Sequence, residues 1–188
     1  MPHIELEKGL PGIRSLFAFR LDAARPMSEL AQILLHEPNS LSRADRELIA
    51  TYVSSLNDCY YCQTCHGAIA AEHLGGNPGL VEQVKLDPAH APVSEKLRAL
   101  LAIAGEVQRG GKNVAAEDIE QAKNHGATDR EIHDTVLIAA AFCMYNRYVD
   151  GLATWAPRDD DEGYRARAAT VAANGYMKLI GDLQNAAR

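Results

Sequence analysis

The stretch Ser42–His66, SRADRELIATYVSSLNDCYYCQTCH, carries two helical patterns on either side of a polar break. Ser42 stands where an N-cap is expected, with Asp45 three residues later, and apolar side chains then recur at helical spacing. These apolar residues are Leu48, Ile49, Tyr52, Val53 and Leu56. The pair Asn57-Asp58 ends this helix and is expected to cap a second one, which carries the cysteines and runs to about His73. Because the connection is short, we expect the two helices to pack as an antiparallel hairpin.

Helical periodicity also dominates the remainder of the chain, and strand signals are almost absent. Pro26 is expected to begin a helix that Pro38 stops, and Gly126 followed by Thr128 marks the junction of a later helix pair. The segment 74–79, LGGNPG, is predicted to be a turn. The other expected helices span 94–109, 115–125, 128–152 and 164–183. These patterns predict an all-α fold, a helical bundle.

The chain length of 188 residues suits one domain with a terminal arm. We expect residues 1–157 to form a helical domain that includes the N-terminal helices. An acidic linker at 159–162 follows, and it leads to the helix that starts at Tyr164. We expect residues 158–188, the linker and the C-terminal helix together, to pack on this domain or on a neighbouring subunit.

Part of the sequence repeats itself at a constant offset of 84 residues. The matches suggest a duplicated helical hairpin, and the alternative is a chance similarity between two amphipathic helices. In the second copy Asn146 and Asp150 replace Cys62 and His66, so a true repeat would keep the chemistry only in the first copy. The matched positions are Asp45-Arg46-Glu47 with Asp129-Arg130-Glu131, Cys59 with Cys143, and Gly67 with Gly151.

The composition has 19 basic and 25 acidic residues, a net charge of -6, and no cluster of Lys and Arg. The positive surface that a nucleic acid or an anionic membrane would need is therefore missing, and neither partner is expected. Residues 1–20 lack the apolar run of a signal peptide, and the longest apolar run, 136–145, is about half of a bilayer-spanning helix. We expect a cytoplasmic protein.

Three of the 4 cysteines lie within residues 59–65, a pattern that in a reducing cytosol is more often catalytic or metal-binding than a disulfide lattice. Cys59 and Cys62 have the C-x-x-C spacing of a redox dithiol. Cys62, Cys65 and His66 have the C-x-x-C-H spacing of a haem attachment site, which the missing export signal disfavours. A zinc ion is disfavoured because four ligands on one helix cannot readily surround it. We therefore expect neither a metal nor a cofactor.

A dithiol at the start of a helix has a physical route to reactivity. At ~100° per residue, Cys59, Cys62 and His66 share one helix face, and Cys65 lies on its flank. The unpaired N–H groups of the helix N-terminus favour a thiolate. His66, one turn beyond Cys62, is a candidate proton relay, and Glu47 on the preceding helix is a candidate terminal acceptor.

The spacing Glu47-x11-Cys59-x2-Cys62-x3-His66 resembles in full the motif of the AhpD-like alkylhydroperoxidases, in the carboxymuconolactone decarboxylase superfamily. Segments 26–62 and 131–152 look like the branch described as uncharacterised peroxidase-related proteins. The resemblance extends over most of the chain. It implies an all-helical AhpD-like bundle, assembled as a homo-oligomer, in which those four motif residues are catalytic.

The resemblance also implies a role for each motif residue. Cys62 attacks the peroxide, Cys59 closes the resulting sulfenic acid into a disulfide, and His66 and Glu47 move the proton. Reduction is expected from a partner dithiol, lipoyl or thioredoxin-like, and the homo-oligomer is expected to be a dimer, trimer or hexamer. Tyr61 stands where some members have a histidine between the cysteines, so proton handling is expected to differ.

Two other functions stay open. The same disulfide would suit a non-enzymatic redox sensor or interaction protein that uses it as a switch. Lactone chemistry, as in the namesake of the superfamily, is a further alternative, but it does not need the cysteine pair. The role of Cys65 is open as well, since it either forms an alternative bridge with Cys62 or packs in the core.

Overall fold

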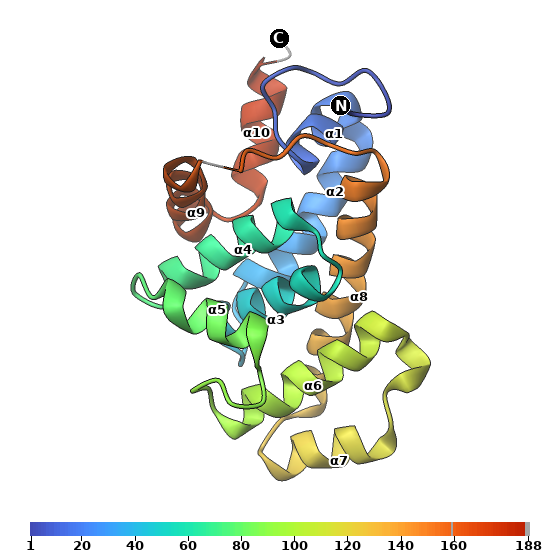
Figure 1. The fold of residues 1–188 in the computed structure, drawn as a ribbon, viewed down its shortest axis with the longest axis vertical. Coiled ribbons are helices and arrows are strands. Elements are labelled where there is room, and N and C mark those ends of the chain that lie inside the picture. The colour runs from blue at the N-terminus through green and yellow to red at the C-terminus, as the bar shows by residue number, and fades with distance from the viewer. Residues whose placement is uncertain (159, 187–188) are drawn as a thin grey trace.

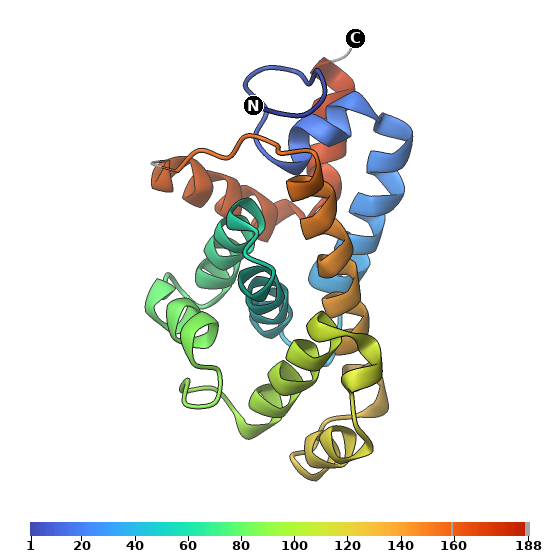
Figure 2. The same ribbon diagram turned by 45° about the vertical axis from the view of Figure 1, so that its right-hand side comes forward.

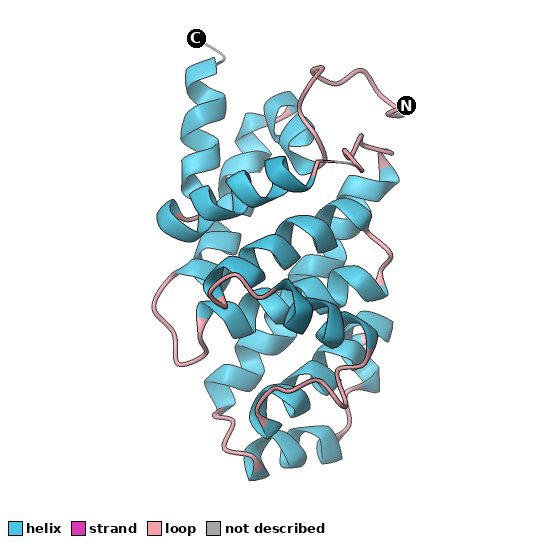
Figure 3. Cartoon of the chain, turned by 60° about the vertical axis from the view of Figure 1, so that its left-hand side comes forward, coloured by secondary structure: helices cyan, strands magenta, loops and turns pink. Residues whose placement is uncertain are grey.

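The computed structural model describes residues 1–158 and 160–186, with side chains to Leu183, and over these residues the fold contains no strand (Figure 3). The predicted all-α fold is confirmed. None of the described helices has the length and apolar character needed to span a membrane. The elements are α1 (Ile13–Phe19), α2 (Leu21–Ala31), a π-helical segment η1 (Gln32–His36), α3 (Arg43–Leu56), α4 (Tyr60–His73), α5 (Pro78–Leu86), α6 (Glu95–Arg109), a 3-10 turn η2 (Gly111–Asn113), α7 (Ala116–Asn124), α8 (Asp129–Gly151), α9 (Asp161–Asn174) and α10 (Met177–Ala186).

The antiparallel hairpin of α3 and α4 lies at the centre of the molecule (Figure 1). Ser42 caps α3 as expected, since its hydroxyl accepts a hydrogen bond from the Asp45 amide at 3.0 Å. Leu48 is 1% exposed, and Ile49 and Val53 are 0% exposed. This apolar face enters the main core, where α6 and α8 pack against α3 (Figure 2). Burial of these side chains is the main force that holds the hairpin in place.

The start of the chain differs from the prediction. α2 begins at Leu21, so Pro26 lies inside the helix and not at its start, and α1 precedes it. Ala24 and Ser28 are buried on its inner face, because tertiary packing outweighs the hydrogen bond that the proline lacks.

α2 continues into the π-helical segment η1, which the buried Arg46 attaches to α3. The Arg46 guanidinium donates to the Leu34 carbonyl at 2.9 Å and to the Glu37 carbonyl at 3.0 Å. These are carbonyls that the end of a helix leaves without intrahelical partners. Arg46 therefore fixes η1 beside Glu47, its neighbour on α3.

The turn between α3 and α4 is tighter than predicted. Asp58 adopts a φ of 53°, and Cys59, not Asn57 or Asp58, is the N-cap residue of α4. The Asn57 side chain is not free to cap α4 because it donates to Asn146 Oδ1 on α8 at 2.8 Å. The sharp turn places Cys59 and Cys62 at the start of α4, against α8.

Residues 74–79 also hold more structure than the predicted turn. Asn77 caps α5, accepting a hydrogen bond from the Leu80 amide at 3.2 Å, and Pro78 occupies the first helical position. Proline suits that position because its amide would have no intrahelical partner there. α5 then packs against both α3 and α4.

The helix predicted over 164–183 is two helices. Gly175 separates α9 from α10 with φ 75° and ψ -175°, a backbone conformation open almost only to glycine. A Cβ atom at this position would collide with Gln32 Oε1. The two helices run in different directions (Figure 1), and Tyr176 lies at the junction between them.

α9 packs along α4, and α10 packs against α2 (Figure 2). The described part of 158–188 therefore packs on its own chain. The division of the chain after residue 157, and any contact of the C-terminal part with a neighbouring subunit, remain predictions. Asp159, in the expected linker, lies outside the described residues.

The interpretation of the sequence repeat as a duplicated hairpin is wrong. α8 runs unbroken from Asp129 to Gly151, so the second copy contains no turn. The positions that correspond to Asn57 and Asp58 are Ala141 and Phe142, which are 5% and 1% exposed. These apolar side chains pack in the core and continue the helix, whereas the polar pair ends it.

Candidate active site

Three side chains from separate segments meet at a buried carboxylate. Glu47 on α3 is 1% exposed, and its Oε2 lies 2.8 Å from Nδ1 of His66 on α4. The hydroxyl of Tyr176 donates to Glu47 Oε1 and lies 3.2 Å from His66 Nδ1. A carboxylate buried to this degree needs such hydrogen bonds to remain in the fold. The structure thus brings together Glu47 and His66, which the sequence analysis paired, and adds Tyr176.

Tyr176 is held by the irregular segment η1. Its backbone amide donates to Gln32 Oε1 at 2.8 Å, beside the tight approach of Gly175 to the same side chain. π-helical turns of this kind are frequent at functional sites. Burial and the Glu47 carboxylate raise the pKa of Tyr176 well above its ordinary value, so the phenol keeps its proton and acts as a hydrogen-bond donor.

The His66 ring is fixed on two sides. Phe142 meets it edge-on at a centroid distance of 4.6 Å, and Tyr176 lies nearly parallel to it at 5.9 Å. A carboxylate can only accept hydrogen bonds, so with Glu47 ionised the hydrogen of the neutral ring sits on Nδ1. Nε2 then keeps its lone pair and is the nitrogen that can take a proton.

The predicted dithiol lies at the start of α4. Cys59 is 0% exposed and Cys62 is 4% exposed, and both are free thiols. They share an apolar cluster with Tyr61, Val149 and Tyr164. The two cysteines therefore belong to one packed group in the reduced protein.

The surroundings of Cys62 do not favour the thiolate that the helix N-terminus led us to expect. The neighbouring Cys59 thiol, and then burial, raise the pKa of Cys62 well above its ordinary value, while a hydrogen bond with Asn146 lowers it. Asp150 approaches Cys59 from the same helix, α8. Asn146 and Asp150 are the residues that the sequence repeat aligned with Cys62 and His66, and here they flank the thiol pair. Cys62 is protonated at neutral pH and needs a base to become a nucleophile.

A cavity of about 370 Å³ opens in front of Cys62 and His66. α4 forms one wall, and α1, α2, α9 and the Gly175-Tyr176 junction form the others. Glu47 and Cys59 do not line this cavity. A small molecule inside it would touch Cys62 and His66, and its volume is in the range of cavities that hold small organic ligands.

Cys65 also lines the cavity, one turn of α4 beyond Cys62. Burial raises the pKa of the Cys65 thiol to about 12, so it is a poor nucleophile at neutral pH. Of the two roles left open for it, the structure gives neither a bridge nor a place in the main core. It is a free thiol in the cavity wall.

Comparison with known proteins agrees with this geometry. Residues 22–84, which contain Glu47, Cys59, Cys62 and His66, match the sequence model of the carboxymuconolactone decarboxylase family. The fold is similar to an uncharacterized peroxidase-related protein from Silicibacter sp. TM1040, with a TM-score of 0.74 and 28% identity over 84% of this chain and 80% of that chain. A second such protein, from Ralstonia eutropha JMP134 and described as an alkylhydroperoxidase AhpD core, gives a TM-score of 0.74 and 28% identity over 82% of this chain and 81% of that chain. No curated protein matches the chain.

The chain belongs to the AhpD-like proteins of the carboxymuconolactone decarboxylase superfamily. The resemblance stated for its sequence is therefore confirmed. Within the part of the AhpD-like chain that the structure describes, no group of three or more His, Cys, Asp or Glu side chains is arranged to hold a metal ion.

The sequence analysis missed two residues of the AhpD-like site, Gln32 and Tyr176. Both lie where the chain departs from regular helix, Gln32 in the π-helical segment and Tyr176 directly after Gly175. The available signal was Gly175 itself, a glycine inside an otherwise helical pattern, which often marks a break or a close packing contact.

Proposed function

We propose that this AhpD-like chain is a thiol-dependent peroxidase, which reduces hydroperoxides through the Cys59-Cys62 dithiol. The observation that supports the proposal most is that Cys62 and His66 line one cavity while Glu47 binds the far side of the His66 ring. A nucleophile, a base and a group that orients the base are thus present in one place. The description of the Ralstonia relative as an alkylhydroperoxidase core agrees with this proposal.

Cys62 attacks, because it faces the cavity and Cys59 does not. His66 Nε2 takes the Cys62 proton, and the thiolate attacks the terminal oxygen of the hydroperoxide. The O–O bond breaks, an S–O bond forms, and the proton on His66 passes to the alkoxide, which leaves as an alcohol. Cys62 becomes a sulfenic acid, oxidised by two electrons, as the hydroperoxide is reduced by two.

Cys59 then resolves the intermediate. Its thiol attacks the Cys62 sulfur, the S–S bond forms, and the hydroxyl group leaves as water with the Cys59 proton. A partner dithiol, lipoyl or thioredoxin-like, returns two electrons and becomes a disulfide in turn. This donor, a homo-oligomer and a cytoplasmic location remain predictions.

Glu47 and Tyr176 support the proton transfer without contacting the peroxide. The Glu47 carboxylate stabilises the imidazolium that forms when His66 accepts a proton, and it holds Nδ1 so that Nε2 faces away from it. Tyr176 keeps that carboxylate in place by donating to its other oxygen.

The test is turnover of tert-butyl hydroperoxide with a dithiol reductant for the wild type and for Cys59→Ser, Cys62→Ser and Cys65→Ser. We expect the Cys59→Ser and Cys62→Ser proteins to lose turnover and the Cys65→Ser protein to keep most of it. Full turnover by Cys62→Ser would refute the proposal.

One observation favours a second candidate, a redox sensor. The raised pKa of Cys62 implies slow attack on peroxide unless His66 acts efficiently. A sensor would form the same Cys59–Cys62 disulfide and change its binding to a partner while turnover stays negligible. Lactone chemistry, the third candidate, would survive in a Cys59→Ser/Cys62→Ser double variant.

A further inference from the structure

Two arginines stand in the wall of the otherwise largely apolar cavity. Arg14 comes from α1 and Arg167 from α9, on the two segments that face Cys62 and Cys65 across the cavity. The apolar part of the lining includes Ile13, Phe17, Met27, Ile69, Phe142 and Leu179. A cavity with a long apolar surface and two cations has the chemical character of a site for an amphipathic anion.

Neither guanidinium is fully satisfied by the protein. Among the described residues, the buried Nε atoms of Arg14 and Arg167 and the buried Nη2 of Arg167 have no hydrogen-bond partner. Unpartnered buried donors are rare in folded proteins and are often completed by a ligand. The Arg14 side chain forms no ion pair with any described residue, so its charge is available to such a ligand.

The acidic groups around the cavity leave most of this positive charge in place. Asp160 lies 3.5 Å from Arg167 Nη2, but its side chain is 44% exposed and the pair is open to solvent. Asp182 lines the cavity and is itself paired with Lys178 at 2.5 Å. These two ion pairs leave Arg14 without a counterion.

The position of Arg14 depends on a close contact in the fold. Gly12 precedes α1 with a φ of 55°, and a Cβ atom there would collide with the Tyr61 ring on α4. The chain can therefore pass directly over the cysteine helix, and α1 starts with Arg14 at the cavity. The arginine is placed by the same glycine that lets α1 cover the site.

We propose that this cavity binds hydroperoxides of aliphatic carboxylic acids, with the carboxylate on Arg14 and Arg167 and the chain along the apolar wall. The inference rests on the proposed peroxidase function, and it names the substrate class of that site. Arg14 and Arg167 are binding residues in this account, and Cys62 remains the group that reacts with the O–O bond.

Binding of a non-reactive probe tests the site apart from turnover. In calorimetry with the full reduced chain, decanoate is expected to bind at least about tenfold more tightly than decanol, since a charge-assisted contact is worth that much. Shortening the acid by one methylene is expected to weaken binding about fourfold. Equal affinity for decanoate and decanol would overturn the inference.

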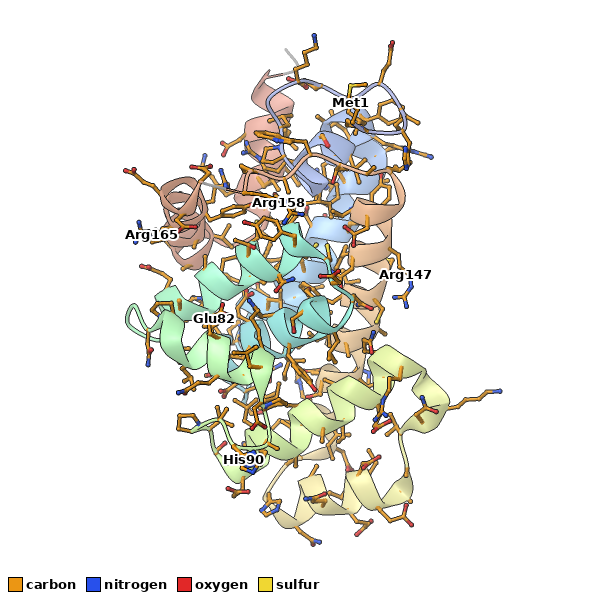
Figure 4. The ribbon with its side chains drawn as sticks, in the orientation of Figure 1. Met1, Glu82, His90, Arg147, Arg158 and Arg165 are labelled. Carbon is orange, nitrogen blue, oxygen red and sulfur yellow. The ribbon has the colours of Figure 1, made fainter. Side chains whose placement is uncertain are left out.

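Variants on α1 and α9 locate the effect. The Arg14→Gln/Arg167→Gln protein is expected to lose the preference for decanoate over decanol. Arg165→Gln is the matched control, because Arg165 lies on α9 and points away from the body of the molecule (Figure 4), and it is expected to keep the preference. Retention of the preference by the double variant would contradict the assignment.

A conservative pair covers the case in which the glutamine variant does not fold. Arg14→Lys/Arg167→Lys keeps both charges and loses the planar donor geometry, so it is expected to bind decanoate more weakly than wild type yet more tightly than decanol. A folded lysine pair with no preference would contradict the proposal.

Kinetics separate this inference from the proposed function. We expect kcat/KM for an aliphatic hydroperoxy acid to exceed that for its methyl ester about tenfold, and the glutamine double variant to lower this ratio toward one. A ratio near one in the wild type, with turnover of both compounds, refutes the acid site and leaves the peroxidase intact. Tight decanoate binding in a protein without any peroxide turnover refutes the peroxidase and leaves the acid site.

Discussion

Tyr176, from the junction of the last two helices, donates a hydrogen bond to Glu47, the buried carboxylate that binds His66. Glu47 and His66 are 19 positions apart in the sequence, whereas Tyr176 is 129 positions from Glu47. The C-terminal segment is thus part of the candidate active site.

Tyr176→Phe removes the hydroxyl and leaves Glu47 Oε1 buried without its partner. A hydrogen bond to a charged group contributes about 1.5–3 kcal/mol, so we expect the free energy of unfolding to fall by about that amount. Peroxide turnover is expected to fall about tenfold or more, because Glu47 is no longer held against His66. Denaturant unfolding and steady-state kinetics measure the two effects, and unchanged turnover would exclude Tyr176 from the site.

Glu47→Gln removes the charge that stabilises protonated His66. Because general acid–base catalysis contributes about 100-fold or more, we expect kcat to fall by at least that factor. Glu82→Gln is the matched control, since Glu82 lies exposed on α5 (Figure 4) and its ion pair with Lys85 is a surface contact. Equal activities of the two variants would show that Glu47 has no role in proton transfer.

Gly175→Ala tests how the Tyr176 junction is built. The alanine would have to adopt φ 75° and ψ -175° and would press its Cβ against Gln32, so we expect a loss of about 1–3 kcal/mol in stability together with reduced turnover. Gly181→Ala is the control: a Cβ added at Gly181 would have no atom within 4 Å, and alanine suits helix α10, so stability should rise by about 0.5–1 kcal/mol. Thermal unfolding of both proteins checks the contrast, and two similar melting temperatures would contradict it.

Cys62 makes the stability of the reduced protein depend on alkaline pH. Its pKa is raised in the folded state by Cys59 and by burial, so above the unfolded-state value, about 8.5, the folded protein holds the proton longer than the unfolded chain. Stability from this thiol is fully present below that pH and is lost as pH rises toward the folded-state pKa. We expect the stability difference between wild type and Cys62→Ser to change between about pH 8.5 and 10, in the direction that disfavours the wild type. A difference that stays constant would show that the pKa of Cys62 is not raised.

Residues 42–66 show why much of the site could be predicted from sequence. The Ser42 cap, the buried stripe of α3 and the short connection to α4 are local features, and together they place Glu47 beside His66. A motif with fixed spacing on two adjacent helices survives small errors in helix boundaries.

Tyr176, Gln32 and the cavity could not be predicted in the same way. Their contacts join segments more than 100 residues apart, and they depend on an irregular π-helical turn and on a glycine with positive φ. The raised pKa of Cys62 likewise depends on burial against α8, which outweighs the local effect of the helix N-terminus. Local patterns predict which residues are reactive, while their environment comes from tertiary packing.

The most direct test is the chemical fate of the thiols after one equivalent of peroxide, measured by mass spectrometry of the full chain. No Lys or Arg lies between Arg46 and Lys85, so trypsin leaves the three clustered cysteines in one peptide, and serine variants assign the bond. We predict a Cys59–Cys62 disulfide in the wild type and in Cys65→Ser, and a trappable sulfenic acid on Cys62 in Cys59→Ser. A sulfenic acid on Cys59 in Cys62→Ser, or a disulfide that requires Cys65, would contradict the account.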